Sequence, residues 1–262
     1  MSSRTPTLNE ALSAHTDYAL SNVYTAIPGI VVSVGNQGEN RIDVQPAINA
    51  RSPDGLEVTE RPSILNVPVI MPVSKKGGLT FPITPGESVL LVFTMRGMDI
   101  WKRSNGYPTT PSDRRMFDVR DCFAIPGAFP FGESPNNPGK RSNSHSPDDV
   151  VLVHNIGSGS EVEVRLKKSG GVEITTNQEV KVNAKQVEIN APESTFKGHV
   201  TIEQGLDLGG GSGATMTITG NIQHTGSIES SGGSITHEGK DIGSTHRHGG
   251  VEPGGGETDV PV

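Results

Sequence analysis

Pairs of aliphatic residues, two positions apart and separated by polar residues, recur through the C-terminal half of the chain. Side chains two residues apart in an extended strand point to the same side, so each pair predicts a short strand with one apolar face. The pairs are Val162 and Val164, Val172 and Ile174, Val180 and Val182, Val187 and Ile189, and Val200 and Ile202. Farther along, single isoleucines surrounded by Gly, Ser and Thr continue the pattern at Ile222, Ile228, Ile235 and Ile242. The repeat predicts a β-helical shaft over residues 150–243.

One chain cannot fill the interior of such a shaft. Only one or two aliphatic side chains are present in each repeat, and the whole chain is 32% hydrophobic and 4% aromatic, with 33 Gly. A single-chain solenoid, the next candidate, needs a larger core, and a coiled coil needs two apolar positions per heptad and good helix formers. Three chains winding around one axis place three side chains in each layer and leave no lateral strand edge. We therefore expect an intertwined trimeric β-helix.

The first half of the chain predicts a separate barrel domain. Thr7 and Glu10 have the spacing of a helix capping box, which predicts a short helix within an N-terminal segment of residues 1–22. Residues 23–118 contain about five short strands separated by turn residues, the pattern of an oligomer-binding-type (OB-type) β-barrel. Residues 119–149 are rich in Pro and Gly and predict a connector. The expected fold class is all-β, with the barrel followed by the trimeric β-helix.

Charge and cysteine content exclude several classes of protein. The net charge of −7 argues against a nucleic-acid partner, because phosphate backbones are bound mainly by Lys and Arg. The single cysteine, Cys122, excludes an intrachain disulfide, and its apolar neighbours predict a small buried residue rather than a nucleophile. No apolar run approaches the ~20 residues of a membrane span, and no signal peptide is recognisable at the N-terminus. We expect synthesis as a soluble cytoplasmic product.

Residues 244–262 close the repeat as an apex and contain the pair His246 and His248. In an extended strand these two imidazoles point to one side and Arg247 points to the other. A threefold axis multiplies the pair to six imidazoles, the ligand number of an octahedral site. Zinc prefers four ligands, so six favour one iron ion per trimer, with nickel or zinc as alternatives. Such a closed site is structural. A His-x-His pair on an ordinary protein surface is the alternative interpretation.

No group of residues in the sequence predicts catalysis. The glycine-rich residues 209–215 lack the Gly-Lys-Ser/Thr ending of a phosphate-binding loop, and no Gly-x-Ser-x-Gly elbow is present. No carboxylate pair has a context that separates an acid from a base. We expect a protein that is not an enzyme and that has no catalytic residues.

Two stretches of the sequence resemble the central spike proteins of contractile-tailed phages, which form the membrane-piercing tip of the baseplate. Residues 79–93, with 113–115 and 121–127, are similar to the N-terminal barrel domain of that family. Residues 239–251 and the glycine-rich end resemble the spike apex. The two matches cover both ends of the chain, and the middle agrees by pattern only.

The resemblance implies a homotrimer with an apical iron, whose ligand positions match His246 and His248 directly. Arg247 stands where a small polar residue is common in the family. The barrel is implied to bind tail tube or baseplate hub proteins, and tail contraction to drive the spike through the host outer membrane. The protein is thus expected in the virion, at the tail baseplate tip, after synthesis in the host cytoplasm. It is expected to enter the outer membrane and periplasm during host cell entry.

Two other functions compete with the spike. A polysaccharide hydrolase on a β-helix scaffold needs paired acidic residues in a groove and aromatic side chains that stack on sugar. Phe196 is the single aromatic residue of residues 150–262. A receptor-binding fibre usually ends in a larger globular head, whereas about fifteen residues follow the histidine pair. Both alternatives predict saturable glycan binding or turnover, which the spike does not.

Overall fold

Strand β8 (Ser88–Phe93) is central to the N-terminal barrel, and its apolar sequence reflects that position. The computed structural model describes residues 7–52, 56–143, 145–208, 216–231, 233–243 and 254. The chain divides into two units, Met1–Lys185 and Gln186–Val262. Every second residue of β8 is fully buried, and the alternate residues are half-buried. A strand covered on both faces is expected to be largely apolar, and β8 is apolar at every residue except Ser88.

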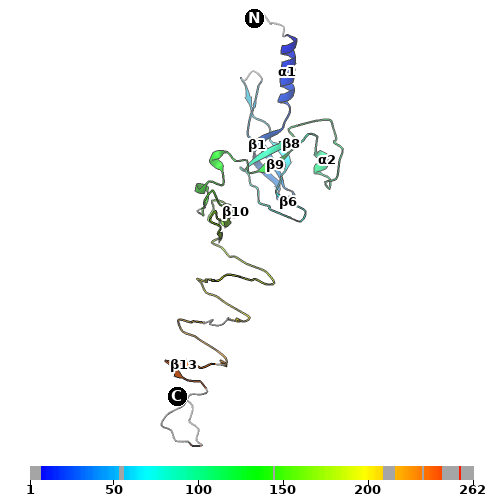
Figure 1. Ribbon diagram of the computed structural model, residues 1–262. Helices are drawn as coiled ribbons and strands as arrows, with labels where there is room; N and C mark the ends of the chain where they lie inside the picture. The colour runs from blue at the N-terminus through cyan, green and yellow to red at the C-terminus, as the bar shows by residue number, and fades with distance from the viewer. Residues whose placement is uncertain are drawn as a thin grey trace. The chain divides into compact units, whose positions relative to one another are not determined.

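Five antiparallel strands of the first unit form one curled sheet, in the order β5-β2-β1-β8-β9. Figure 1 shows β1, β8 and β9 side by side. The strands besides β8 are β1 (Ala26–Asn36), β2 (Arg41–Pro46), β5 (Ile64–Pro68) and β9 (Cys122–Pro126). The sheet closes where Val69 makes a parallel bridge to Ala124, and the Ile70 N–H donates to the Ala124 carbonyl oxygen at 2.8 Å. The expected OB-type barrel is confirmed, and its fifth strand lies beyond residue 118, where the sequence pattern placed its end.

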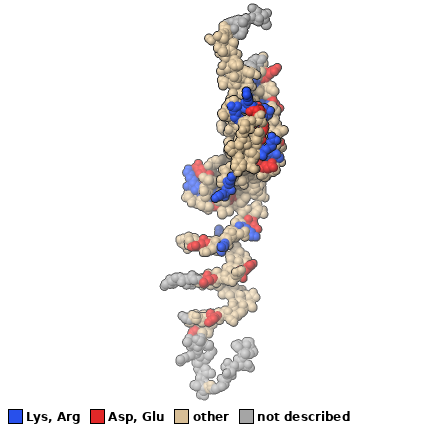
Figure 2. Space-filling view, turned by 90° about the vertical axis from the view of Figure 1, so that its right-hand side faces the viewer, with Lys and Arg blue, Asp and Glu red and all other residues tan. Residues whose placement is uncertain are grey.

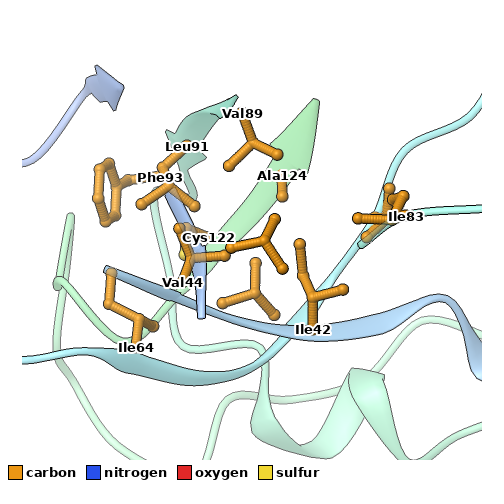
Figure 3. Packing of buried hydrophobic residues seen from close by; sticks show 12 residues of the cluster. Ile42, Val44, Ile64, Ile83, Val89, Leu91, Phe93, Cys122 and Ala124 are labelled. Atoms are coloured by element: carbon orange, nitrogen blue, oxygen red, sulfur yellow. The ribbon is translucent and has the colours of Figure 1, made fainter. Parts of the chain in front are cut away.

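The inward side chains of these strands form the barrel core shown in Figure 3. The β1–β2 register shifts twice, between Val31 and Ser33 and between Val34 and Asn36, and such bulges bend a strand as closure requires. Glycine is needed at position 29, where β1 pairs with β2, because a Cβ atom on Gly29 would lie 2.5 Å from Val44 Cγ1. The buried apolar residues are Val31, Ile42, Val44, Ile64, Val67, Val69, Ile83, Val89, Leu91, Phe93, Cys122 and Ala124.

The remaining elements of the barrel region are short, apart from one N-terminal helix. Helix α1 (Leu8–Ser21) begins after Thr7, whose side chain and that of Glu10 form the expected capping box. Two hairpins and a one-turn helix decorate the barrel: β3 (Ala50–Arg51) with β4 (Val58–Thr59), β6 (Val73–Ser74) with β7 (Gly77–Gly78), and α2 (Asp99–Lys102). Short 3-10 turns occupy Gln37–Glu39, Phe131–Glu133 and Pro138–Lys140.

A second antiparallel sheet follows the connector, and we name it the collar sheet. It consists of β10 (Val150–His154), β11 (Val162–Leu166) and β12 (Val172–Thr175), in that order. The aliphatic pairs at 162 and 164 and at 172 and 174 therefore lie in strands, as the sequence predicts.

Between the collar sheet and residue 234, the described part of the chain is an open trace that forms no ladder with itself. Among the described residues from 176 to 234, no backbone N–H donates to a backbone carbonyl group. The predicted strands at 180–182, 187–189 and 200–202 are not formed within this chain, because these residues have no partner strand among its described residues. In Figure 1 the second unit is an open trace that runs back and forth. Its regular structure, in the described part, is the hairpin of β13 (Thr236–His237) and β14 (Lys240–Asp241).

Candidate assembly surface and apex

One face of the collar sheet, which we name the collar face, carries aliphatic side chains from all three strands. Val150 lies opposite Leu166, which lies opposite Val172, and the next row is Leu152, Val164 and Ile174. His154 and Val162 complete the face. Val150 and Val172 are 67% and 70% exposed, and most of the other side chains are exposed as well. A contiguous apolar surface of this kind marks a site of contact with another protein surface.

The opposite face of the collar sheet holds a buried ionic network. The Arg141 guanidinium donates from Nε to Glu161 Oε1 at 3.1 Å and from Nη2 to Glu163 Oε2 at 2.6 Å. Arg165 donates from Nε to Glu163 Oε1 at 3.2 Å. The side chains of Arg141, Glu161 and Glu163 are almost completely buried. Each carboxylate thus has a cationic partner within its own chain, which offsets the cost of burial.

Backbone N–H groups of the connector and of the loop between β10 and β11 complete the coordination of Glu161. Gly157, Ser142 and Asn143 donate to its two carboxylate oxygens at 2.7, 3.1 and 3.1 Å. Burial by itself raises the pKa of this carboxyl group, but the hydrogen bonds from these N–H groups and from Arg141 outweigh burial and lower the pKa to about 2. Glu161 is therefore ionised at neutral pH and fixes the connector to the collar sheet.

The two faces of the collar sheet differ in whether residues of the same chain cover them. The polar face is satisfied by residues of the same chain, whereas the collar face has no cover among the described residues. Leaving several Val, Leu and Ile side chains in water forgoes about 1.5–3 kcal/mol each. The collar face is therefore the surface of this sheet that gains most from a partner.

The second unit combines exposed aliphatic residues with backbone groups that, in its described part up to residue 234, have no backbone partner. Figure 2 shows its described surface as mostly uncharged, with acidic and basic residues in small groups. Unpaired backbone groups gain most from the ladder hydrogen bonds of a neighbouring strand. The exposed aliphatic residues are Val187, Ile189, Val200, Ile202, Leu206, Leu208, Ile218, Ile222, Ile228, Ile235 and Ile242.

The outer face of the barrel also carries apolar rows. Ala26 lies opposite Val92, which lies opposite Phe123, and Pro28, Leu90 and Ile125 form the next row. Trp101 of α2 packs edge-on against Phe123, with ring centroids 5.5 Å apart. Part of this face is exposed, including Ile125 and Trp101. It is a second surface suited to a protein contact.

The sequence-predicted metal ligands, His246 and His248, lie outside the described residues, as does Arg247. Within the part of the chain that is described, no three His, Cys, Asp or Glu side chains are arranged to hold a metal ion. Cys122 is buried in the barrel core, and burial raises the pKa of its thiol to about 12. The thiol is therefore protonated at neutral pH, and its burial agrees with the small buried residue that its apolar neighbours predict.

Two functional features were missed by sequence reasoning. The collar face was available from the alternation Val162-Glu163-Val164-Arg165-Leu166, which places aliphatic residues on one side and charges on the other. The ionic network was not, because Arg141 lies in the connector and no local pattern links it to residues 161 and 163.

Comparison with known families identifies both ends of the chain. Residues 27–127 match the model of the phage protein Gp138 N-terminal domain, and residues 244–262 match that of the GpV Apex motif. The first match spans the five barrel strands, and the second contains the histidine pair. Comparison with curated proteins gives no match. None of the described helices is long and apolar enough to cross a bilayer. The two matches indicate a phage tail protein of the spike type.

Proposed function

We propose that this phage tail spike-type chain forms a homotrimer that acts as the central spike of a contractile tail and pierces the host outer membrane. The observation that supports the proposal most directly is the collar face, an apolar sheet surface without cover in its own chain. Three collar faces turned toward one axis bury one another and leave the three ionic networks on the outside. The extended chain beyond the collar then finds its partner strands in the other two chains.

Three chains suit the second unit better than one. Each repeat supplies one or two aliphatic side chains, and a threefold axis brings three copies of each into a layer. Pairing between chains also satisfies the backbone groups of residues 176–234, which have no backbone partner among the described residues. A shaft built in this way has no exposed lateral edge and resists bending, as a piercing device requires.

The barrel is the part proposed to attach the spike to tail tube or baseplate hub proteins. Its match to the Gp138 N-terminal domain and the apolar rows on its outer face support this assignment. Attachment through one end leaves the shaft free to project from the tail. The protein would then be found at the tail baseplate tip of the virion and would meet the outer membrane and periplasm on infection.

The apex is proposed to hold one metal ion on the threefold axis through His246 and His248. Their alternation in sequence and the match to the GpV Apex motif, which is associated with a metal-binding apex, support this site. Six neutral imidazole nitrogens favour iron over nickel or zinc. Bound there, the ion would crosslink the three chain ends and so stabilise the tip. No substrate position remains in such a site, which agrees with a protein that is not an enzyme.

The native mass tests the assembly on which the proposal depends. A trimer of the 27.6 kDa chain has a mass of about 83 kDa, which light scattering distinguishes from the monomer. A protease-resistant monomer would contradict the proposal.

Membrane piercing needs a separate test in assembled particles. Particles that carry the spike with His246→Ala and His248→Ala should adsorb normally but release less potassium from host cells. Normal potassium release by these particles would argue against a role of the metal apex in breaching the membrane.

A further inference from the structure

Helix α1 is fully formed, and it is exposed along its whole length within the described part of the chain. None of its 14 residues is buried. The Glu10 N–H donates to Thr7 Oγ1 at 3.3 Å, and the Thr7 N–H donates to Glu10 Oε2 at 2.7 Å. Isolated helices shorter than about 12–15 residues are marginal in water, and caps alone do not replace packing. A helix of this length and exposure gains stability from packing against a partner.

The barrel fixes only the residues that follow the helix. The Tyr24 N–H donates to the Phe117 carbonyl oxygen at 3.1 Å, and the Tyr24 ring lies 5.2 Å from that of Phe93. Arg61 Nη1 donates to the Tyr24 hydroxyl oxygen at 2.8 Å. Residues 21–23 separate this anchor from Leu20, so the C-terminal end of the helix is held at a fixed point and its sides remain accessible.

The side chains of α1 divide into an apolar stripe and an acidic side. At about 100° per residue, the stripe covers about 120° of the circumference. The acidic residues Glu10 and Asp17 lie on the opposite side of the helix, nearly in line with each other. The stripe consists of Leu8, Ala11, Leu12, His15, Tyr18 and Ala19.

We propose that the α1 helices of three copies of this chain pack against one another along this stripe as a parallel three-helix bundle. The inference rests on the proposed function, which sets the number of copies at three. A stripe of this width suits a bundle in which each helix faces two neighbours. Leu8, Ala11, His15 and Tyr18 fall at alternating spacings of three and four, the spacing of a helical seam.

The distribution of charge on α1 favours other copies of the same helix as the partner of the stripe. No carboxylate lies in the stripe, so three like helices meet without opposing acidic groups, and Glu10 and Asp17 of every copy face water. The short seam would be too weak to hold free chains together. Helices already tethered to one trimer meet at an effective concentration in the millimolar range, which suffices for a weak contact.

Cysteine crosslinking of the full-length chain tests the bundle. Cys122 is the single cysteine and is buried, so a cysteine introduced into α1 reacts alone. Under mild oxidation Ala11→Cys, within the stripe, should give about tenfold more covalent dimer than Ser13→Cys on the acidic side. Each disulfide joins two of the three chains, so dimer is the expected product on a denaturing gel.

A matched pair of leucine substitutions shows whether the stripe itself causes the contact. Leu12 and Leu20 are 55% and 64% exposed on the same helix, but only Leu12 lies in the stripe. Added to Ala11→Cys, Leu12→Glu should abolish the crosslink, and Leu20→Glu should preserve it. Equal crosslinking in both, or none from Ala11→Cys in protein that is trimeric by light scattering, overturns the bundle but leaves the proposed function standing. A monomeric mass overturns both.

Discussion

Ile235 and Ile242 lie opposite each other across the β13–β14 hairpin, where the Ile242 N–H donates to the Ile235 carbonyl oxygen at 2.8 Å. Their side chains share one face of the hairpin and are 44% and 55% exposed. The turn between the strands consists of Glu238 and Gly239, both with positive φ, which is typical of a tight two-residue hairpin. A lone hairpin of this size is not stable in water, so its apolar face needs neighbours.

Ile235→Asp tests whether this face turns toward the threefold axis. Three carboxylates would then meet away from water, which should destabilise the distal shaft by about 4 kcal/mol or more. Thermal unfolding and limited proteolysis of the trimer measure the effect. Thr236→Asp, on the other face of the same strand, is the control and should change little. Similar behaviour of the two variants would place the axis elsewhere.

Arg141→Ala tests the ionic network of the collar sheet. Removing one member of a buried ion pair leaves the other uncompensated, and about 3–5 kcal/mol of stability should be lost. Denaturant unfolding followed by circular dichroism measures this loss. The control is Arg120→Ala, because Arg120 also binds a carboxylate, that of Asp118, but its side chain is 65% exposed. Its removal should matter little. A small effect at Arg141 would show that the network contributes little stability.

The pKa of Glu161 predicts an acid sensitivity of the collar. Its folded-state pKa is about 2, against 4.5 for an unperturbed glutamate, so the folded state holds the carboxyl group ionised. The stability from this group is complete above the unperturbed value and is lost as the pH falls from roughly 5 to 2. Glu161→Gln should lower stability at neutral pH and weaken its dependence on pH in this range. An unchanged dependence would assign the acid sensitivity to other carboxylates.

Metal analysis tests the apex. The purified trimer should contain close to one iron ion, and acid should release it because protons compete for the imidazole nitrogens. His246→Ala with His248→Ala should remove more than about nine-tenths of the metal and fray the distal end, while the barrel stays folded. The control pair His224→Ala with His237→Ala should retain the ion. Unchanged metal content in the first variant would leave His246 and His248 as surface histidines.

Local patterns in the sequence were sufficient to predict that a barrel and the helix α1 form. The apolar run of β8 and the capping box of Thr7 and Glu10 reflect contacts made within a few residues or within one sheet. The sequence pattern assigned the fifth barrel strand, Cys122–Pro126, to the connector of residues 119–149, whereas the family resemblance placed residues 121–127 with the barrel domain. Its place in the barrel depends on pairing with β8, which is distant in sequence.

For the shaft, by contrast, the sequence does not predict which strands pair. The alternation at Val187 and Ile189 predicts a strand, and these residues form no strand within their own chain. No pattern within one chain specifies which strand it pairs with when the partner is another copy. The contact of Arg141 with Glu163 is hidden for a related reason, since a long side chain reaches a sheet formed 22 residues later.

Because Glu161 and Glu163 are neutralised within their own chain, a nascent chain can complete its collar sheet before it meets another copy. Docking of three finished collar sheets would then align the chains residue by residue before their C-terminal segments entwine. Assembly would proceed in one direction, from the docked collar sheets to the tip. To slip one chain by a repeat, the docked collar sheets would first have to separate. Docking would thus hold a repetitive, glycine-rich segment in a single alignment.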